Sequence, residues 1–320
     1  MNLQKLYTPL KVIALPTLYA IVLRLFFDVK TWGELFNVMS LSFLFCLPTI
    51  VGAMTVYFSP IEKTRKLAYR ILVPWVPIFL FLIVTLIVAL EGWACWLMVL
   101  PLFLIAASLG GLLGGWLKLR QKDNKTYLSI LMLAPICLSP IEQWIGANHQ
   151  TYKAYTFIDI HAPADSIWNQ VVRVSEIQAS QDKGWLTRTL GFPRPVKAEL
   201  NYKGVGASRE AIFTNGLVFH ETVLEYIEGK KMVFTIKAYP SEIPSTTLDE
   251  HVVIGGEYFD VLTGTYELEQ LNTTTCRLHL YSHFSMKTTF NSYASAWATW
   301  IMKDIQNNIL QIEKERAELN

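Results

Sequence analysis

Two long, uninterrupted apolar stretches constrain this chain more than any other feature of its sequence. Residues 71–90 and 93–117 contain no Asp, Glu, Lys or Arg. Each stretch is long enough to cross the hydrocarbon core of a bilayer, which takes about 20 apolar residues. Only 17% of the 320 residues are charged, against roughly 25% in typical globular proteins. The sequence therefore predicts a membrane protein and argues against a disordered or collagen-like chain.

Charge divides the chain into two parts. Residues 1–150 carry 12 Lys and Arg and 6 Asp and Glu, a net of +6, whereas residues 151–320 carry 16 and 20, a net of −4. We therefore expect an all-α transmembrane domain over residues 1–147 and a folded domain over residues 151–320. The negative charge of the second domain disfavours nucleic-acid binding and strong electrostatic attraction to anionic lipid head groups.

Five transmembrane helices are expected in the first domain. Their approximate ranges are 9–27, 35–58, 70–90, 93–117 and 126–145. Four basic residues fall within 63–70, after the second span, and four within 118–125, after the fourth. Because basic loops stay in the cytoplasm, five spans predict an inner-membrane protein with a cytoplasmic N-terminus and a periplasmic C-terminal domain. A change of one in the span count would reverse the side of that domain.

A glycine pattern ends the fourth expected span. Gly110 and Gly114 form one GxxxG pair, and Gly111 and Gly115 form a second, overlapping pair. Small residues at this spacing let two helix backbones approach closely. The pattern fits packing within the bundle, which we favour, and it also fits a homo-oligomer or a membrane-protein partner.

The second domain alternates in the manner of strands before it ends in a long helix. A strand is expected over 154–161 and a helix follows from Ala162 to about Val174, with Pro163 near its first turn. An irregular stretch follows over 178–195. Six further strands are expected at about 198–203, 206–214, 217–227, 231–239, 256–269 and 275–285, with a long loop at 240–250.

The closing helix is expected over 290–317. Its apolar stripe is Tyr293, Trp297, Trp300, Ile301, Ile305, Ile309 and Ile312, and polar residues including Gln306 fall on the other side. This order of elements predicts an α+β fold in which an antiparallel sheet wraps around the terminal helix. A curved sheet and a helix can enclose an apolar cavity between them.

Several segments of the second domain resemble one known superfamily. They are FIDIHAPADSIWNQVV (157–172), GVGASREAIFTNGLVFHETVLEY (204–226), YFDVLTGTYELE (258–269) and the closing helix SYASAWATWIMKDIQNNIL (292–310). Together they are similar to the START-like, helix-grip superfamily (SRPBCC), which includes polyketide cyclases, aromatases and lipid-transfer domains. The resemblance covers about residues 154–315 and implies the helix-grip fold. It implies no single activity, because the superfamily hosts binding, transport and catalysis.

Arg209 and Glu221 flank the Asn215-Gly216 turn and are the first candidate site residues. A three-residue turn from Asn215 to Leu217 would place Glu221 opposite Ala211 and diagonal to Arg209, on one face of the sheet. The pair fits a structural ion pair. It also fits a polar anchor for a ligand head group, since a guanidinium suits a carboxylate or a phosphate.

Aromatic residues form the rest of the candidate ligand site. Tyr258 and Tyr266 share parity on one strand, and Tyr293, Trp297 and Trp300 lie on one side of the closing helix. Ordinary core packing is the alternative for each of them. No cysteine or histidine cluster has the spacing of a metal site, and no nucleophile, phosphate-loop or cofactor motif is apparent, so no cofactor, metal or catalytic residue is predicted.

Three functions are consistent with these features. The first is a membrane-anchored domain that binds a lipid or another hydrophobic small molecule, for transport, sequestration or sensing. The second is a cyclase- or dehydratase-type enzyme acting on a polyketide-like substrate, with Arg209, Glu221 and Tyr266 as its polar groups. The third is an interaction subunit of a membrane complex that has no ligand, for which the glycine pattern is the only support. We favour the first, without catalysis.

Overall fold

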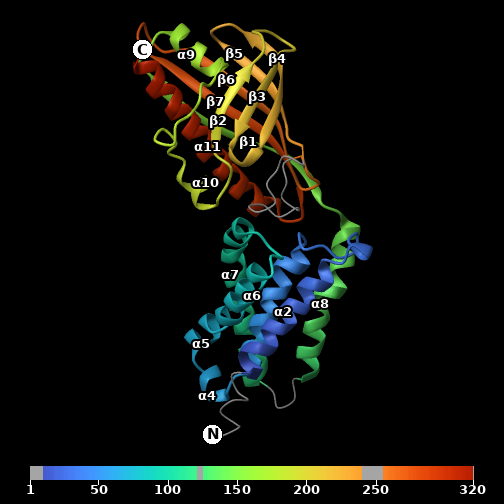
Figure 1. The fold of residues 1–320 in the computed structure, drawn as a ribbon. Helices are drawn as coiled ribbons and strands as arrows, with labels where there is room; N and C mark the ends of the chain where they lie inside the picture. The colour runs from blue at the N-terminus through green and yellow to red at the C-terminus, as the bar shows by residue number, and fades with distance from the viewer. Residues whose placement is uncertain (1–9, 121–124, 240–254, 320) are drawn as a thin grey trace. The chain divides into compact units, whose positions relative to one another are not determined.

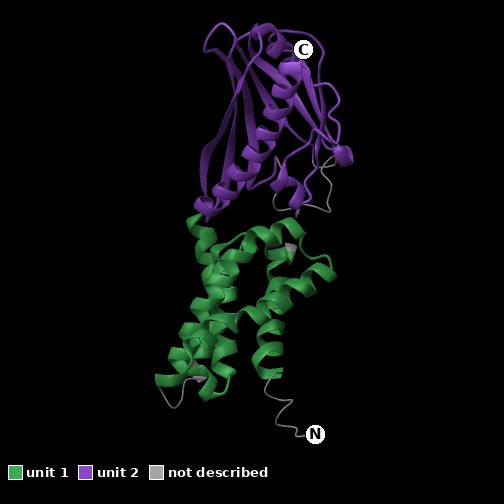
Figure 2. Cartoon of the chain, turned by 90° about the vertical axis from the view of Figure 1, so that its left-hand side faces the viewer, with its two compact units in different colours: residues 1–147 green, residues 148–320 purple. Residues whose placement is uncertain are grey.

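The chain forms two compact units, residues 1–147 and 148–320 (Figure 2). The structure is a computed structural model that describes residues 10–120, 125–239 and 255–319. The expected loop at 240–250 therefore lies outside the described residues.

Unit 1 is entirely helical in its described part (Figure 1). Its longer helices are α2 (Leu15–Phe27), α3 (Leu47–Phe58), α6 (Trp75–Ile87), α7 (Trp93–Arg120) and α8 (Lys125–Ile145). Short elements are η1 (Leu10–Ala14), η2 (Lys30–Trp32), η3 (Ser42–Cys46), α4 (Ile61–Thr64) and α5 (Leu67–Leu72).

Four helical segments of the described residues are long and apolar enough to cross a membrane. They are Leu10–Phe27, Leu67–Ile87, Trp93–Arg120 and Tyr127–Ile145. The expected count of five is not confirmed, because the second expected span forms a shorter apolar helix over Ser42–Phe58. Residues 50–56 within α3 are all buried inside the unit. This segment therefore packs chiefly against its neighbouring helices.

The close packing of α3 depends on the glycines of α7. A Cβ atom added to Gly110 would lie 1.8 Å from the backbone oxygen of Thr49, and one added to Gly114 would lie 2.2 Å from that of Ala53. Gly111 and Gly115 face α5 instead, at the backbone and side chain of Arg70. All four glycines of the two GxxxG pairs therefore approach helices of the same chain.

In its described residues, unit 2 is a seven-stranded antiparallel sheet with three α-helices. The strand order is β1-β7-β6-β5-β4-β3-β2. The strands are β1 (Asn148–Ile160), β2 (Pro195–Leu200), β3 (Ser208–Phe213), β4 (Val218–Ile227), β5 (Lys231–Lys237), β6 (Phe259–Gln270) and β7 (Cys276–Thr288). The helices are α9 (Ala164–Val172), α10 (Trp185–Thr189) and α11 (Asn291–Leu319). The predicted antiparallel sheet with a long C-terminal helix is confirmed.

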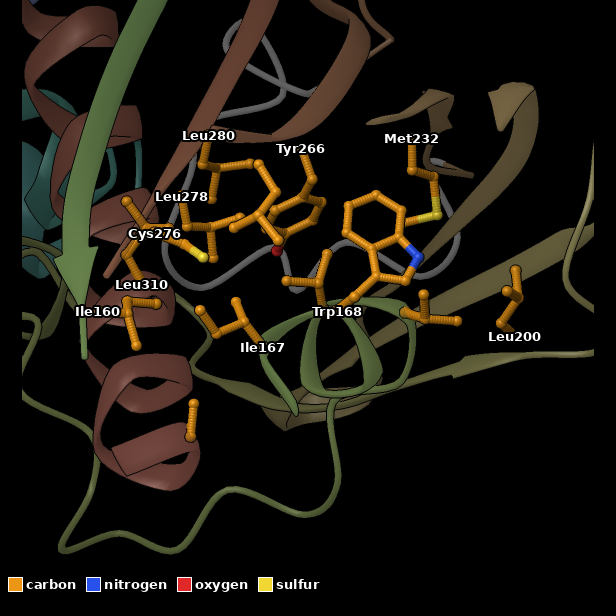
Figure 3. Close-up of a cluster of buried hydrophobic side chains, with 14 of the residues drawn as sticks. Ile160, Ile167, Trp168, Leu200, Met232, Tyr266, Cys276, Leu278, Leu280 and Leu310 are labelled. Carbon is orange, nitrogen blue, oxygen red and sulfur yellow. The ribbon is translucent and has the colours of Figure 1, made fainter. Parts of the chain in front are cut away.

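The core of unit 2 lies between the sheet and the helices. Figure 3 shows Leu278, Leu280 and Tyr266 from the sheet pointing toward Ile167 and Trp168 of α9. The α9 helix is amphipathic, and Ile167, Trp168, Val171 and Val172 are its buried residues. Burial of these side chains holds α9 against the sheet, because each fully buried large apolar side chain contributes about 1.5–3 kcal/mol.

The inward face of α11 matches the predicted apolar stripe only in part, because Ile312 is buried and Ile309 packs against the core but other members of the stripe do not. Gln306 is buried and donates from Nε2 to the Ser282 hydroxyl at 3.1 Å, while its Oε1 accepts from the Thr156 hydroxyl at 3.2 Å. Trp300, which the stripe places inside, is 46% exposed. The line that faces the sheet is therefore rotated toward smaller and polar residues, since small side chains let the helix lie closer to the strands.

Candidate functional site

Four polar side chains meet in the interior of unit 2, and each comes from a different element. Arg209 lies on β3, Glu221 on β4, Tyr266 on β6 and Glu313 on α11. All four are at most 5% exposed. We call these four residues the buried polar cluster.

Arg209 and Glu221 form the charged part of the buried polar cluster. They are direct cross-strand partners, and Arg209 Nη1 donates to Glu221 Oε2 at 2.5 Å. The predicted register differs, because the hairpin turns at Thr214–Gly216 with Phe213 opposite Leu217. Asn215 and Gly216 adopt left-handed backbone conformations (φ 62° and 82°), which Asn and Gly tolerate best.

Apolar side chains surround this ion pair. The Arg209 guanidinium carbon lies 5.3 Å from the centre of the Phe234 ring and 5.9 Å from that of Tyr266. Phe234, Tyr266 and Trp168 belong to the same buried hydrophobic cluster. A guanidinium beside aromatic faces gains cation–π attraction, about 2 kcal/mol or more where water is excluded.

Glu313 is the member of the cluster that the sequence analysis did not identify. Burial raises the pKa of its carboxyl group to about 8, although the charge of Arg209 and the hydroxyl of Tyr266 both act to lower it. Neither of its carboxyl oxygens has a hydrogen-bond partner of good geometry, and neither does Arg209 Nε. Burial also raises the pKa of the Tyr266 phenol well above its usual range. Glu313 is therefore protonated at neutral pH, and the poorly aligned Tyr266 hydroxyl leaves part of its hydrogen-bonding capacity unused.

A signal for Glu313 exists in the sequence, but on a different helical line from the predicted stripe. Ala298, Met302, Gln306, Leu310, Glu313 and Ala317 recur at spacings of three and four residues. In the structure these residues are buried or pack against the core of unit 2. The predicted stripe followed the neighbouring line of residues because that line carries the large aromatic side chains.

The remaining predicted ligand-binding residues lie elsewhere. Trp300 contacts Trp297 and Trp185, with ring centres 5.3 Å and 5.8 Å apart. Trp300 on α11 and Trp185 on α10 are exposed, and Trp297 is half-buried. Tyr293 is half-buried near the start of α11. Of the predicted residues, the structure gathers Arg209, Glu221 and Tyr266 in one place.

A β-bulge separates Tyr258 from Tyr266. The register of β6 against β7 shifts between Val261 and Thr263. Phe259 and Val261 pack inside before the bulge, and Tyr266 and Leu268 pack inside after it. Tyr258 itself lies in a bend just before β6, so it is not on the strand that carries Tyr266, in contrast to the prediction that both lie on one strand.

Comparison with solved structures finds likenesses over about half of the chain, in the C-terminal sheet and helix. Norcoclaurine synthase from Thalictrum flavum shares 14% identity, with 52% of this chain and 94% of that one covered and a TM-score of 0.32. The Zhui aromatase/cyclase from a Streptomyces species shares 12%, with 53% and 94% covered and a TM-score of 0.35. A START superfamily protein from Mycobacterium smegmatis shares 9%, with 54% and 99% covered and a TM-score of 0.35.

No protein-family model and no curated protein matches the chain. At these identities and TM-scores, the solved structures carry no conclusion about ligand or activity.

Proposed function

We propose that unit 2 binds a hydrophobic small molecule, a lipid or another apolar metabolite, between its sheet and α11. The observation that carries this proposal is the buried polar cluster, in which Arg209 Nε and both carboxyl oxygens of Glu313 lack hydrogen-bond partners of good geometry inside an apolar core. Leaving a buried polar group unpaired costs about 1–3 kcal/mol. A bound head group that supplies the missing partners would offset this cost, while its apolar body would contact the surrounding side chains.

Unit 1 serves in this proposal as the membrane anchor. Four described helices have the length and composition of membrane spans. We further propose an inner-membrane location with a cytoplasmic N-terminus and a periplasmic unit 2, on the basis of the basic loops. This side requires that Ser42–Phe58 also crosses the membrane. Anchoring would keep unit 2 at a high local concentration near a membrane-borne ligand.

The binding proposal is tested on the full chain. The protein is purified from native membranes, reconstituted in nanodiscs of one synthetic lipid, and extracted for mass spectrometry. We expect a native small molecule at a fixed ratio to protein. Its absence from every preparation, together with no binding of added apolar probes, would overturn the proposal.

Two double variants separate interior binding from lipid carried over on unit 1. Arg209→Met with Glu221→Leu removes the charges of the buried polar cluster and keeps similar volume, and it should lose the molecule. Arg277→Met with Asp159→Leu removes a similar cross-strand ion pair whose side chains are 32% and 42% exposed. This second variant should keep the molecule. Equal loss or equal retention in the two variants would contradict binding at the buried polar cluster.

Acid catalysis is the second candidate function, and Glu313 is the observation that favours it. A carboxyl group with a pKa of about 8 beside a tyrosine hydroxyl can donate a proton or a hydrogen bond to a carbonyl oxygen. A cyclase or dehydratase reaction on a polyketide-like substrate would use such a donor. Turnover of a small ketone probe that disappears in Glu313→Gln, with the probe still bound, would support catalysis over binding alone.

A further inference from the structure

The partners missing from the buried polar cluster indicate the chemistry of the group that fits there. Arg209 Nε has a hydrogen to donate. A protonated Glu313 has one hydroxyl to donate and lone pairs to accept with. The complementary group must therefore accept from Arg209 and exchange a hydrogen bond with Glu313.

The net charge of the buried polar cluster also limits which head groups can bind there. The charge of Arg209 is already neutralised by Glu221, its direct cross-strand partner. The titratable and charged groups that influence Glu313 are Arg209 from β3, Tyr266 from β6 and Arg316 from its own helix. With Glu313 protonated, the buried polar cluster has no net charge. An anionic head group would add an uncompensated charge to an apolar interior, which is strongly unfavourable.

We propose that the buried polar cluster selects ligands with an uncharged hydroxyl head group, and that Glu313 and Arg209 are the residues that bind this hydroxyl. The inference rests on the proposed binding function and specifies its ligand class. This ligand class differs from the carboxylate or phosphate that the sequence suggested for Arg209. The reason is that the Arg209 guanidinium already donates to the Glu221 carboxylate. An alcohol is both donor and acceptor, so one oxygen can serve Arg209 Nε and Glu313 together.

The test compares probes that share one tail. The full chain in nanodiscs is mixed with dodecane, dodecanol, dodecyl phosphate or dodecyltrimethylammonium, each at sub-solubilising concentration. The readout is protection of the Cys276 thiol from alkylation, since Cys276 is fully buried in the core of unit 2 and a ligand that binds the folded state slows its exposure. Cys46, Cys95 and Cys137 are replaced by Ala so that one thiol is read.

Dodecanol should protect with an apparent Kd at least about tenfold lower than that of dodecyl phosphate, since a buried unpaired charge costs at least the 1.4 kcal/mol that tenfold represents. Glu313→Gln, which keeps a donor and an acceptor, should retain this protection, and Glu313→Leu should lose it. Glu315→Gln, a change at a less buried glutamate of the same helix, is the matched control and should behave as the unmodified chain.

The remaining outcomes are distinguishable. Equal protection by dodecane and dodecanol would show that the hydroxyl head group is not recognised, which overturns the inference. Preferential protection by the phosphate or by the ammonium probe would overturn it as well, while leaving hydrophobic binding intact. No protection by any of the four probes would count against the inference and the proposed function together.

Discussion

Arg209 and Glu221 face each other directly across β3 and β4, and their ion pair is almost closed to solvent, with side chains 4% and 5% exposed. Burying two charges costs several kcal/mol for each ion, and their attraction repays this only with good geometry and further hydrogen bonds. Arg209 Nε has no such bond. The pair is therefore a weak explanation for stability, and a binding role accounts better for its position.

Removing one member of this pair should destabilise unit 2 far more than removing both. Arg209→Met leaves the Glu221 carboxylate buried without its partner, so we expect a loss of about 3–5 kcal/mol in the free energy of unfolding. Arg209→Met with Glu221→Leu should lose much less, because no charge remains unpaired. Alkylation of Cys276 in increasing urea measures unfolding of unit 2 in the full chain.

The exposed pair of Arg277 and Asp159 provides the comparison. Its two strands are also direct partners, and Arg277 Nε donates to Asp159 Oδ1 at 2.7 Å. Solvent screens this pair, so Arg277→Met should cost less than about 1 kcal/mol. Similar losses for Arg209→Met and Arg277→Met would contradict the role of burial.

Glu313 should make unit 2 less stable as pH rises. Its pKa is about 8 in the folded protein and about 4.5 when unfolded, so the folded state binds more protons between these values. The contribution is fully present below about pH 4.5, and it falls by up to about 1.4 kcal/mol per pH unit as pH rises toward 8. Urea midpoints from Cys276 alkylation across this range measure the slope.

Glu313→Gln isolates the source of this slope. Glutamine has nearly the same shape and does not ionise, so the variant should lose the part of the pH dependence that Glu313 contributes. Glu315→Gln should keep it, because hydrogen bonds from Gln311 and then Lys183 lower the pKa of Glu315 and it stays ionised over this range. A slope that survives in Glu313→Gln would assign the pH dependence to another group.

The fold of unit 2 could be predicted because local pattern and topology agree. Seven strands form near the expected ranges, although β1 begins at Asn148, six residues before the expected start at 154. Pro163 at the start of α9 and the Asn215-Gly216 turn bounded their elements to within a few residues. The exact turn could not be predicted. Whether the three loop residues begin at Thr214 or Asn215 depends on which cross-strand pairs form, and this depends on packing against the rest of the sheet.

Only part of the site could be predicted, because the missing features depend on local geometry and packing that residue types alone do not show. Tyr258 lies in a bend before β6, and the bulge between Val261 and Thr263 shifts the register of the strand after it. On α11, the buried Glu313 and Gln306 occupy a face that hydrophobicity assigns to solvent. In unit 1, the helix over Ser42–Phe58 is apolar, yet it is shorter than the four candidate spans. These features depend on contacts between distant segments.

Asn308 should hold the segment before and within α10 against α11. Its Oδ1 accepts from the backbone N–H groups of Lys183 and Gly184 at 2.7 and 3.1 Å, and its Nδ2 donates to Asp182 at 2.8 Å. Asn308→Ala removes all three bonds and leaves buried groups unpaired. We expect amide hydrogen exchange across residues 182–190 to accelerate about tenfold or more.

Asn307→Ala is the matched control for this experiment. Asn307 is the neighbouring residue on α11 and is exposed. Its truncation should leave exchange in residues 182–190 unchanged. Equal acceleration in the two variants would indicate that a general loosening of α11, and not the Asn308 hydrogen bonds, controls this segment.

Gly110 and Gly115 should differ sharply in their response to the same substitution. The Cβ atom of Gly110→Ala would lie 1.8 Å from the backbone oxygen of Thr49, so α3 and α7 would have to move apart. The Cβ atom of Gly115→Ala would meet the Arg70 side chain, which can rotate. Overpacking of this kind typically costs about 1–3 kcal/mol. We expect Gly110→Ala to lower the thermal midpoint of unit 1 and Gly115→Ala to leave it nearly unchanged.

Alkylation of Cys95, which is buried on α7, measures that midpoint in the full chain with the other three cysteines replaced. If these glycines instead serve only contacts between copies of the chain, both variants would keep the midpoint and alter the oligomeric state in mild detergent, which would contradict packing within unit 1 as their role.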